Sequence, residues 1–128
     1  MAEYADFYRN VTYSRLYDEN SFIGRWLDYS EWNDDEYWKL EKDLINIAIT
    51  YKNTKLIKQD ILIGIMRIIE LLIIPNWDSF TLLTKYNSDI YDRYERFKYI
   101  ISKIFTDENI DLDIFSYNPD KTINQIAR

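Results

Sequence analysis

The chain of 128 residues contains no histidine and no cysteine. Histidine is the side chain whose unperturbed pKa lies nearest to neutrality, and most general acid–base and triad chemistry depends on it. The absence of cysteine removes disulfides, thiolate nucleophiles and cysteine metal sites together. Without either residue, zinc would need carboxylate ligands alone, and a Ser or Thr nucleophile would need a Lys or carboxylate base. We therefore expect no catalytic residues, no cofactor and no metal.

Glycine is also scarce. Gly24 and Gly64 are the only two, and glycines so far apart cannot build a loop that cradles phosphate. The N-terminus, residues 1–6, carries acids and tyrosines where a signal peptide would have a basic region and an apolar run. Because disulfide bridges are common in small secreted domains, the lack of cysteine also favours a reducing compartment. The sequence predicts a cytoplasmic protein.

Acidic residues outnumber basic ones, 22 to 16, which gives a formal net charge of −6. Such a surface repels a phosphate backbone and attracts a basic protein, so we expect a protein partner and no nucleic acid. Hydrophobic residues make up 47% of the chain, enough for a core at this length. We expect one domain over residues 1–128.

Two segments have the hydrophobic periodicity of α-helices. Residues 34–52 follow Asn33, which has with Glu36 the residue types of a capping box, and acids fill the first turn. Residues 89–106 have apolar side chains at alternating spacings of four and three. We predict a helix over each range. The cations of the second helix are expected on a solvated face: Arg93, Arg96, Lys98 and Lys103.

The longest apolar run extends from Ile61 to Ile74 and ends at Pro75. It is too long for a buried strand and, interrupted by Arg67 and Glu70, too short to span a bilayer, so we expect no membrane segment. On a helix, apolar residues would cover nearly the whole circumference. This pattern predicts the central, most buried helix of a bundle. Arg67 and Glu70 would pair on its exposed strip.

The remaining segments are less regular. Short helices are predicted over residues 3–9, 22–27 and 76–83. Residues 110–114 alternate between apolar and acidic, which fits either a short extended segment or a helix start. A turn and then a short helix or loose tail are expected over residues 118–128. The fold class is all-α: a helical bundle of three principal helices plus short helices.

Acidic and aromatic residues alternate between Trp26 and Asp43. Carboxylates can steer a basic partner while exposed rings add buried area at an interface. Alternatively, the acids cap the following helix and the rings pack inside; Trp26 and Trp38 are expected in the core in either case. The predicted partner-binding residues are Asp28, Tyr29, Glu31, Trp32, Asp34, Asp35 and Glu36.

A second acidic group either joins this negative surface or forms a solvated loop. Its members are Asp107, Glu108, Asp111 and Asp113. The carboxylates also leave open an alternative function, a carboxylate-dependent hydrolase or a metal-binding helical enzyme. Against it, no acidic pair is singled out by an apolar pocket, and the segment 111–113 lacks the glycine and distal glutamate of an EF-hand loop.

A pattern of aromatic and small residues runs through residues 10–40. It consists of Asn10, Tyr13, Ser14, Ser21, Phe22, Gly24, Trp26, Leu27, Ser30, Trp32, Tyr37, Trp38 and Leu40. The pattern resembles a family of bacterial immunity proteins that accompany polymorphic toxins, including those of contact-dependent growth inhibition. Residues 90–97 are similar in character. At Gly24 we expect a tight approach of the backbone to a packed ring.

The resemblance implies a cytoplasmic protein that binds the C-terminal toxin domain of its cognate effector and neutralises it. Such toxins are often basic nucleases, and the immunity protein often blocks the active site or an adjacent surface. Because families of this kind diversify their binding surfaces, the shared motif residues are expected to mark scaffold. Our leading hypothesis is a stoichiometric toxin inhibitor that is not an enzyme.

Overall fold

The computed structural model describes residues 3–54, 56–73, 79–84, 89–115 and 117. The helices are α1 (Ala5–Tyr8), α2 (Phe22–Tyr29), α3 (Asp34–Thr50), α4 (Gln59–Leu72) and α5 (Ile90–Ile104), and a 3₁₀ turn, η2, covers Leu112–Ile114. Two short strands, β1 (Glu31–Asn33) and β2 (Thr81–Leu83), form a parallel pair. The all-α prediction is right for the helical framework and misses this small sheet.

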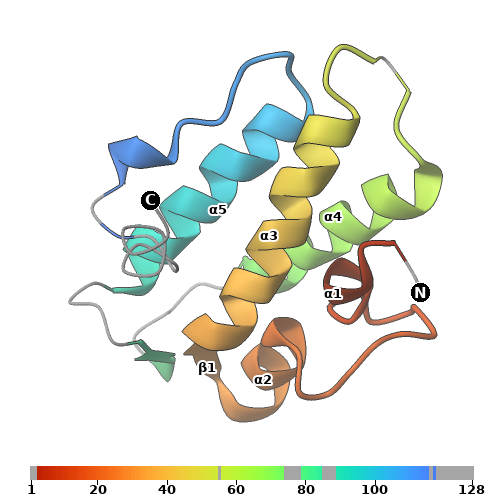
Figure 1. Ribbon diagram of the computed structural model, residues 1–128. Helices are drawn as coiled ribbons and strands as arrows, with labels where there is room; N and C mark the ends of the chain where they lie inside the picture. The colour runs from red at the N-terminus through yellow and green to blue at the C-terminus, as the bar shows by residue number, and fades with distance from the viewer. Residues whose placement is uncertain (1–2, 55, 74–78, 85–88, 116, 118–128) are drawn as a thin grey trace, which may run out of the picture.

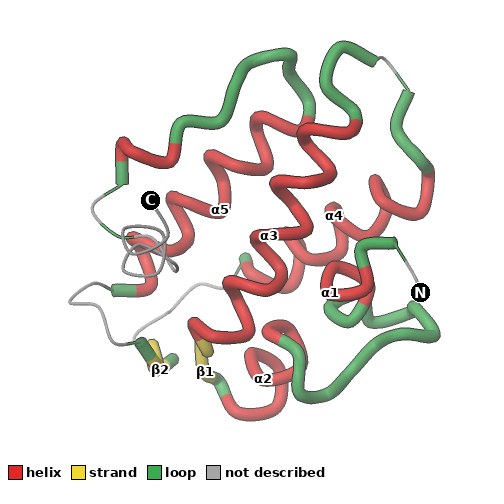
Figure 2. The backbone as a smooth tube through the Cα atoms, in the orientation of Figure 1, coloured by secondary structure: helices red, strands yellow, loops and turns green. Residues whose placement is uncertain are grey.

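α3 is the central helix (Figures 1 and 2), with α5 on one side and α1 and α4 on the other. It begins where the Asn33 side chain accepts the Glu36 N–H at 3.1 Å, and its first turn is acidic, which suits the positive end of the helix dipole. Leu40, Leu44 and Ile47 are fully buried along its length. The helix predicted over residues 34–52 is confirmed, with its end at Thr50.

α4 lies at the periphery rather than at the centre. One side packs on α1 and the loop after it, where Gly64 lies close to Phe7 and Val11. The Trp26 indole N–H of α2 donates to the Leu71 carbonyl at 3.0 Å. The opposite side of the helix is exposed and mixed in character, with Ile63 and Met66 beside Gln59, Asp60 and Glu70. The prediction that this segment forms the most buried helix is therefore wrong, because α3 occupies that place.

The pair on the outer side of α4 behaves as predicted. Arg67 and Glu70, three residues apart, form an ion pair that is exposed to solvent. Arg67 also donates to the Thr12 hydroxyl at 3.2 Å, which ties α4 to the loop after α1. Among the residues that the structure describes, no helix has the length and apolar character needed to cross a membrane.

The strand β2 replaces part of a predicted helix. Residues 81–83 pair with residues 31–33 in parallel, with Trp32 opposite Leu82, and the Thr81 N–H donates to the Ser30 carbonyl at 3.0 Å. Leu82 thereby packs against the core. The short helix predicted over residues 76–83 is therefore wrong for its last three residues, and residues 76–78 lie outside the described ones. Pairing with a distant strand decided the conformation here.

α5 confirms the second predicted helix. Asp89 and Asp92 form a capping box, in which each side chain accepts the other residue's N–H at 3.0 Å. Beyond α5, the segment left open by the sequence forms η2, capped by the Asp111 carboxylate, which accepts the Asp113 N–H at 3.1 Å. The turn and tail predicted over residues 118–128 lie outside the described part of the chain.

The short N-terminal helices are also present, and α2 depends on a glycine. A Cβ atom at Gly24 would lie 2.2 Å from the Glu19 carbonyl oxygen, far inside contact distance. The close approach is thus to backbone and not, as predicted, to a ring. Ser21 caps α2 by accepting the Gly24 N–H at 3.1 Å. The first turn of α2 therefore sits directly on the loop that precedes it.

Candidate functional site

The seven predicted contact residues run from the end of α2 through β1 into the first turn of α3. Trp32, in the middle of β1, is 0% exposed because the strand turns its side chain inward. Its ring packs edge-on against Phe22, with centroids 4.6 Å apart, and against Trp26 at 5.8 Å. Trp32 is therefore a core residue, and in this conformation a docking protein does not reach it.

Asp34 is buried as well, in a bidentate ion pair. Its two carboxylate oxygens accept from Nε and Nη2 of Arg93, each at 2.7 Å. Nη2 also donates to the Thr84 hydroxyl at 2.9 Å, and the guanidinium lies over the Tyr117 ring, 4.0 Å from its centroid. The structure thus places Asp34, one of the predicted contact residues, in the interior, where its carboxylate joins α3 to α5.

A second buried pair lies next to the first. Arg96 donates through Nε and Nη2 to the Glu41 carboxylate, and through Nη1 to the Tyr117 carbonyl at 2.8 Å. Both side chains are almost fully buried. Burial raises the pKa of the Glu41 carboxyl, and the Arg96 guanidinium opposes that shift. The predicted solvated basic face is therefore wrong for Arg93 and Arg96, which are the polar part of the α3–α5 interface.

Two further acids of the predicted set are partly covered and paired. The Glu31 carboxylate accepts from Arg25 at 3.2 Å. Glu36 pairs with Arg9 at 3.1 Å and with Lys39 at 2.8 Å. Cations within this chain thus neutralise much of the charge that the sequence assigned to a partner.

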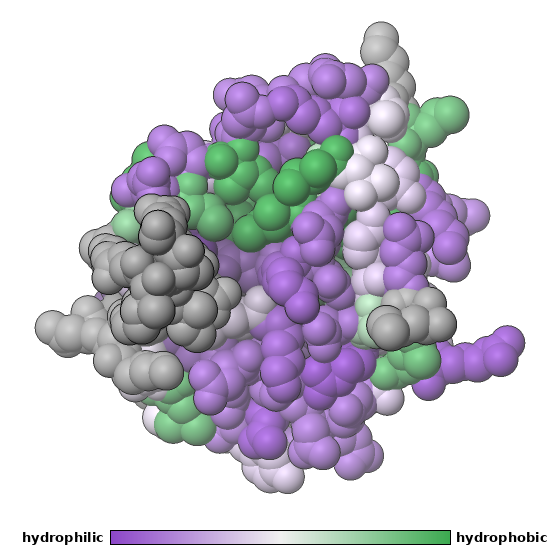
Figure 3. Space-filling model, viewed as in Figure 1, coloured by the Kyte–Doolittle hydropathy of each residue, from purple (hydrophilic) through white to green (hydrophobic). Residues whose placement is uncertain are grey.

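The exposed members of the set are Asp28, Tyr29 and Asp35. Asp28 and Asp35 form no ion pair with any residue that the structure describes, so their charges face solvent. Figure 3 shows a largely hydrophilic surface over the lower half of the molecule, where α2 and the first half of α3 lie. Of the seven predicted contact residues these three are exposed, and we call the two carboxylates among them, Asp28 and Asp35, the exposed acidic residues.

The carboxylates do not gather as a metal site needs. Over the described ranges, no group of three or more Asp or Glu side chains could hold a metal ion. Burial also raises the pKa of Asp43, whose carboxylate accepts the Phe7 N–H at 2.9 Å and so holds the start of α1 to α3. The acidic groups with a raised pKa are thus engaged in packing the helices together.

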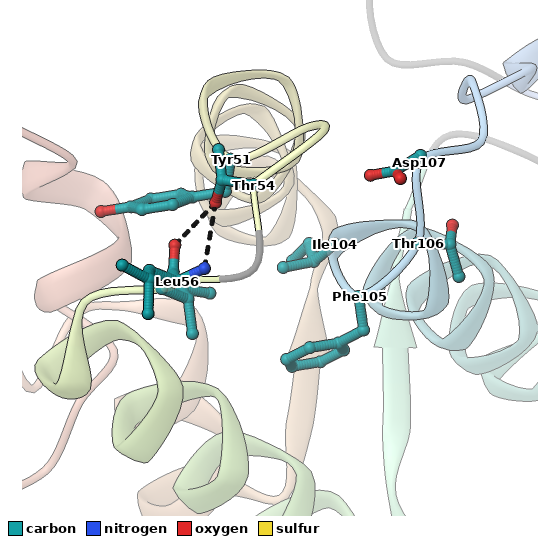
Figure 4. A pocket seen from close by; sticks show the side chains of 8 residues that line it. Tyr51, Thr54, Leu56, Ile104, Phe105, Thr106 and Asp107 are labelled. Atoms are coloured by element: carbon teal, nitrogen blue, oxygen red, sulfur yellow. Dashed lines mark hydrogen bonds between the residues drawn. The ribbon is translucent and has the colours of Figure 1, made fainter.

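A pocket of about 270 Å³ lies at the other end of α3, where the chain turns into α4 and α5 ends (Figure 4). Its lining consists of Tyr51, Thr54, Leu56, Ile57, Ile104, Phe105, Thr106 and Asp107. Figure 4 shows Ile104 and Phe105 pointing across the pocket toward Leu56. The second acidic group begins at its rim, with Asp107, and all four of its members are exposed. The sequence reasoning missed this pocket because its two walls are about fifty residues apart in the chain.

The sequence did contain a signal for the buried arginines. Arg93 stands between Ile90 and Phe97 at helical spacing, so it belongs to the apolar stripe of α5 and not to the opposite face. On α3, Asp34 and Glu41 are seven residues apart, two turns along one face, as partners for neighbouring cations would need to be. The alternation of charges on two facing helices predicts such pairs once the helices are known to be adjacent.

A family model described as Immunity protein 41 matches residues 9–116. The chain belongs to the Immunity protein 41 family. The match extends from the end of α1 to beyond η2 and includes both buried ion pairs. The resemblance to immunity proteins of polymorphic toxins, based on the aromatic pattern, is confirmed, and the family indicates toxin immunity as the function. No curated protein and no solved structure matches the chain.

Proposed function

We propose that this Immunity protein 41 member binds the C-terminal domain of its cognate toxin and neutralises it by stoichiometric inhibition, without catalysis of its own. The observation that carries the proposal is the family match over residues 9–116, which include α2 to α5. The titratable groups support it, because the buried carboxylates hold helices together rather than face an open cleft. The proposed place of action is the cytoplasm.

We further propose that the toxin is a nuclease, delivered by a polymorphic system such as contact-dependent growth inhibition. A nuclease needs a positively charged groove for its phosphate substrate, and the net charge of −6 on this chain suits such a partner. The exposed acidic residues add a local contribution at the end of α2 and the start of α3. Long-range attraction of this kind acts mainly on the rate of association.

The test is a charge reversal at the two unpaired carboxylates, Asp28→Lys with Asp35→Lys. Association with the cognate toxin domain should slow by about tenfold at low salt, because steering raises association rates by about 10- to 1,000-fold. Stopped-flow fluorescence measures this rate. Because both side chains are exposed, circular dichroism should show an unchanged fold.

The matched control is Glu3→Lys with Asp113→Lys, which changes net charge equally at exposed positions near the N-terminus and in η2. If the control slows association as much as the test variant, the effect belongs to overall charge and not to the exposed acidic residues. If neither variant changes the rate, the electrostatic part of the proposal is wrong.

A further inference from the structure

The chain turns back after α5 and runs along that helix (Figure 1). We call this segment, residues 107–115 and Tyr117, the strap. Its side chains are exposed or half-buried except that of Tyr117, which is 5% exposed. The Tyr117 hydroxyl donates to the Asp92 carbonyl, and the Tyr117 carbonyl accepts from Nη1 of Arg96 at 2.8 Å. The guanidinium carbon of Arg93 lies 4.0 Å from the centroid of the Tyr117 ring. Tyr117 thus fastens the strap over the arginines of the two buried ion pairs.

The other contacts of the strap lie at the surface. Its polar contacts with the rest of the chain reach solvent: Asp107 with Asn53, Glu108 with Lys103, Asn109 with Lys52, and Asp111 with Tyr99. Half-buried side chains add apolar contact: Ile110, Leu112 and Phe115. A segment with few buried side chains and solvent-exposed hydrogen bonds opens at a lower free-energy cost than the core does.

A polar group without a hydrogen-bond partner lies beside the place where the strap is fastened. The Tyr37 hydroxyl belongs to a side chain that is 0% exposed, and it bonds to no residue that the structure describes. Burial raises its pKa well above the ordinary value, and Glu41, Arg96 and Tyr117 are the next groups that act on it. Closing the strap over this hydroxyl costs free energy that contact with water would recover.

We propose that the strap is a conformational latch, closed by Tyr117, that opens and closes while the helices stay folded. In the closed form, the two bidentate ion pairs between α3 and α5 are sealed from water. In the open form, water reaches both pairs and the Tyr37 hydroxyl. Because these pairs join α3 to α5, the strap controls how firmly α5 is held. The motion involves this chain alone and does not depend on the proposed function.

The first test needs no substitution. Arg93 and Arg96 each donate through Nε to a buried carboxylate, so NMR exchange of the two Nε protons with solvent reports opening. Their protection should be at least about tenfold lower than that of the Leu44 amide in the middle of α3. It should also change little in urea below the unfolding transition, because strap opening exposes little surface. Equal protection with an equal urea dependence would mean that the pairs open only when the chain unfolds, which overturns the proposal.

The second test compares two buried positions. Tyr117→Ala should speed exchange of the Arg93 and Arg96 Nε protons by about 100-fold, since truncating a buried aromatic residue removes its packing. The matched control is Val11→Ala, at a side chain that is 0% exposed and lies against Gly64 of α4. It destabilises the open and closed forms equally, so it should speed exchange of the Leu44 amide by about tenfold and leave the Nε protons unchanged. Equal acceleration of both in the control would overturn the latch.

The third test changes the hydroxyl. Tyr37→Phe removes the group that closing leaves without a partner, so the closed form should gain and exchange of the Nε protons should slow by about tenfold. An ordinary core truncation has the opposite effect, because it weakens packing. Faster exchange of the Nε protons in Tyr37→Phe would mean that the hydroxyl stabilises the closed strap, which contradicts the proposed cause of opening.

Discussion

The arginines of α5 show how context changes the role of a charged side chain. Arg93 and Arg96 are fully buried, and each forms a bidentate ion pair with one carboxylate of α3. A planar guanidinium can satisfy several acceptors at once and also stack on rings, which a lysine cannot do equally well. The aromatic side chains of Trp38 and Tyr117 provide those rings. The polar contacts thereby fix the register of α5 on α3.

The first prediction concerns the pair of Arg93 with Asp34. Arg93→Met should lower the free energy of unfolding by about 3–5 kcal/mol, because it leaves the Asp34 carboxylate buried without its cation. Urea denaturation measures the change. Glu70→Ala, which breaks the exposed pair on α4, should cost no more than about 1 kcal/mol.

A double variant separates the charge from the packing. Because apolar residues often replace a buried ion pair at little cost, adding Asp34→Leu to Arg93→Met should recover much of the lost stability. If the double variant is no more stable than Arg93→Met alone, the unpaired Asp34 charge is not the cause of the loss.

At the scale of elements, local signals predicted α3 and α5 well. The Asn33 cap directly before α3 and the spacing of the apolar residues in both helices are signals in the local sequence. The outcome differs for β2 and α4, because their conformation or placement depends on distant partners. Thr81–Leu83 is a strand only because residues 31–33 lie beside it, and the burial of α4 depends on which side a neighbour covers. Hydrophobic periodicity shows that a segment is helical, but it does not show which distant segment will cover it.

The second prediction concerns α2. Gly24→Ala should destabilise the protein by at least about 2 kcal/mol, because the added methyl group would lie 2.2 Å from the Glu19 carbonyl oxygen and backbone would have to move. This loss should occur although alanine favours helices by about 1 kcal/mol over glycine. Thermal unfolding measures it. Leu27→Ala, at an exposed position of the same helix, is the control and should change stability little.

For the candidate site, too, the sequence indicated the general function better than it indicated which residues are exposed. Composition alone indicated a protein partner and a non-enzymatic function, and the aromatic pattern indicated the family that the comparison confirmed. The individual contact residues remain a prediction, and the structure divides them into buried and exposed ones. Trp32 is buried because side chains alternate between the two faces of β1 and its own points inward. Asp34 is buried because its carboxylate pairs with Arg93 of α5. The pocket beside α4 arises from two segments far apart in the sequence, so no motif marks it.

At the scale of the whole molecule, the chain combines a neutralised interior with an acidic exterior. Its buried carboxylates are matched by arginines or by backbone N–H groups, and the excess negative charge lies at the surface. A protein with such a surface is suited to attract a basic partner.

The most direct test of the immunity function is a calorimetric titration of the cognate toxin domain with the unaltered chain, combined with an assay of toxin activity on the same samples. A stoichiometric inhibitor should saturate the toxin at a fixed molar ratio, with toxin activity falling in proportion to the fraction bound. Binding that leaves the toxin fully active, or the absence of binding at micromolar concentrations, would contradict it.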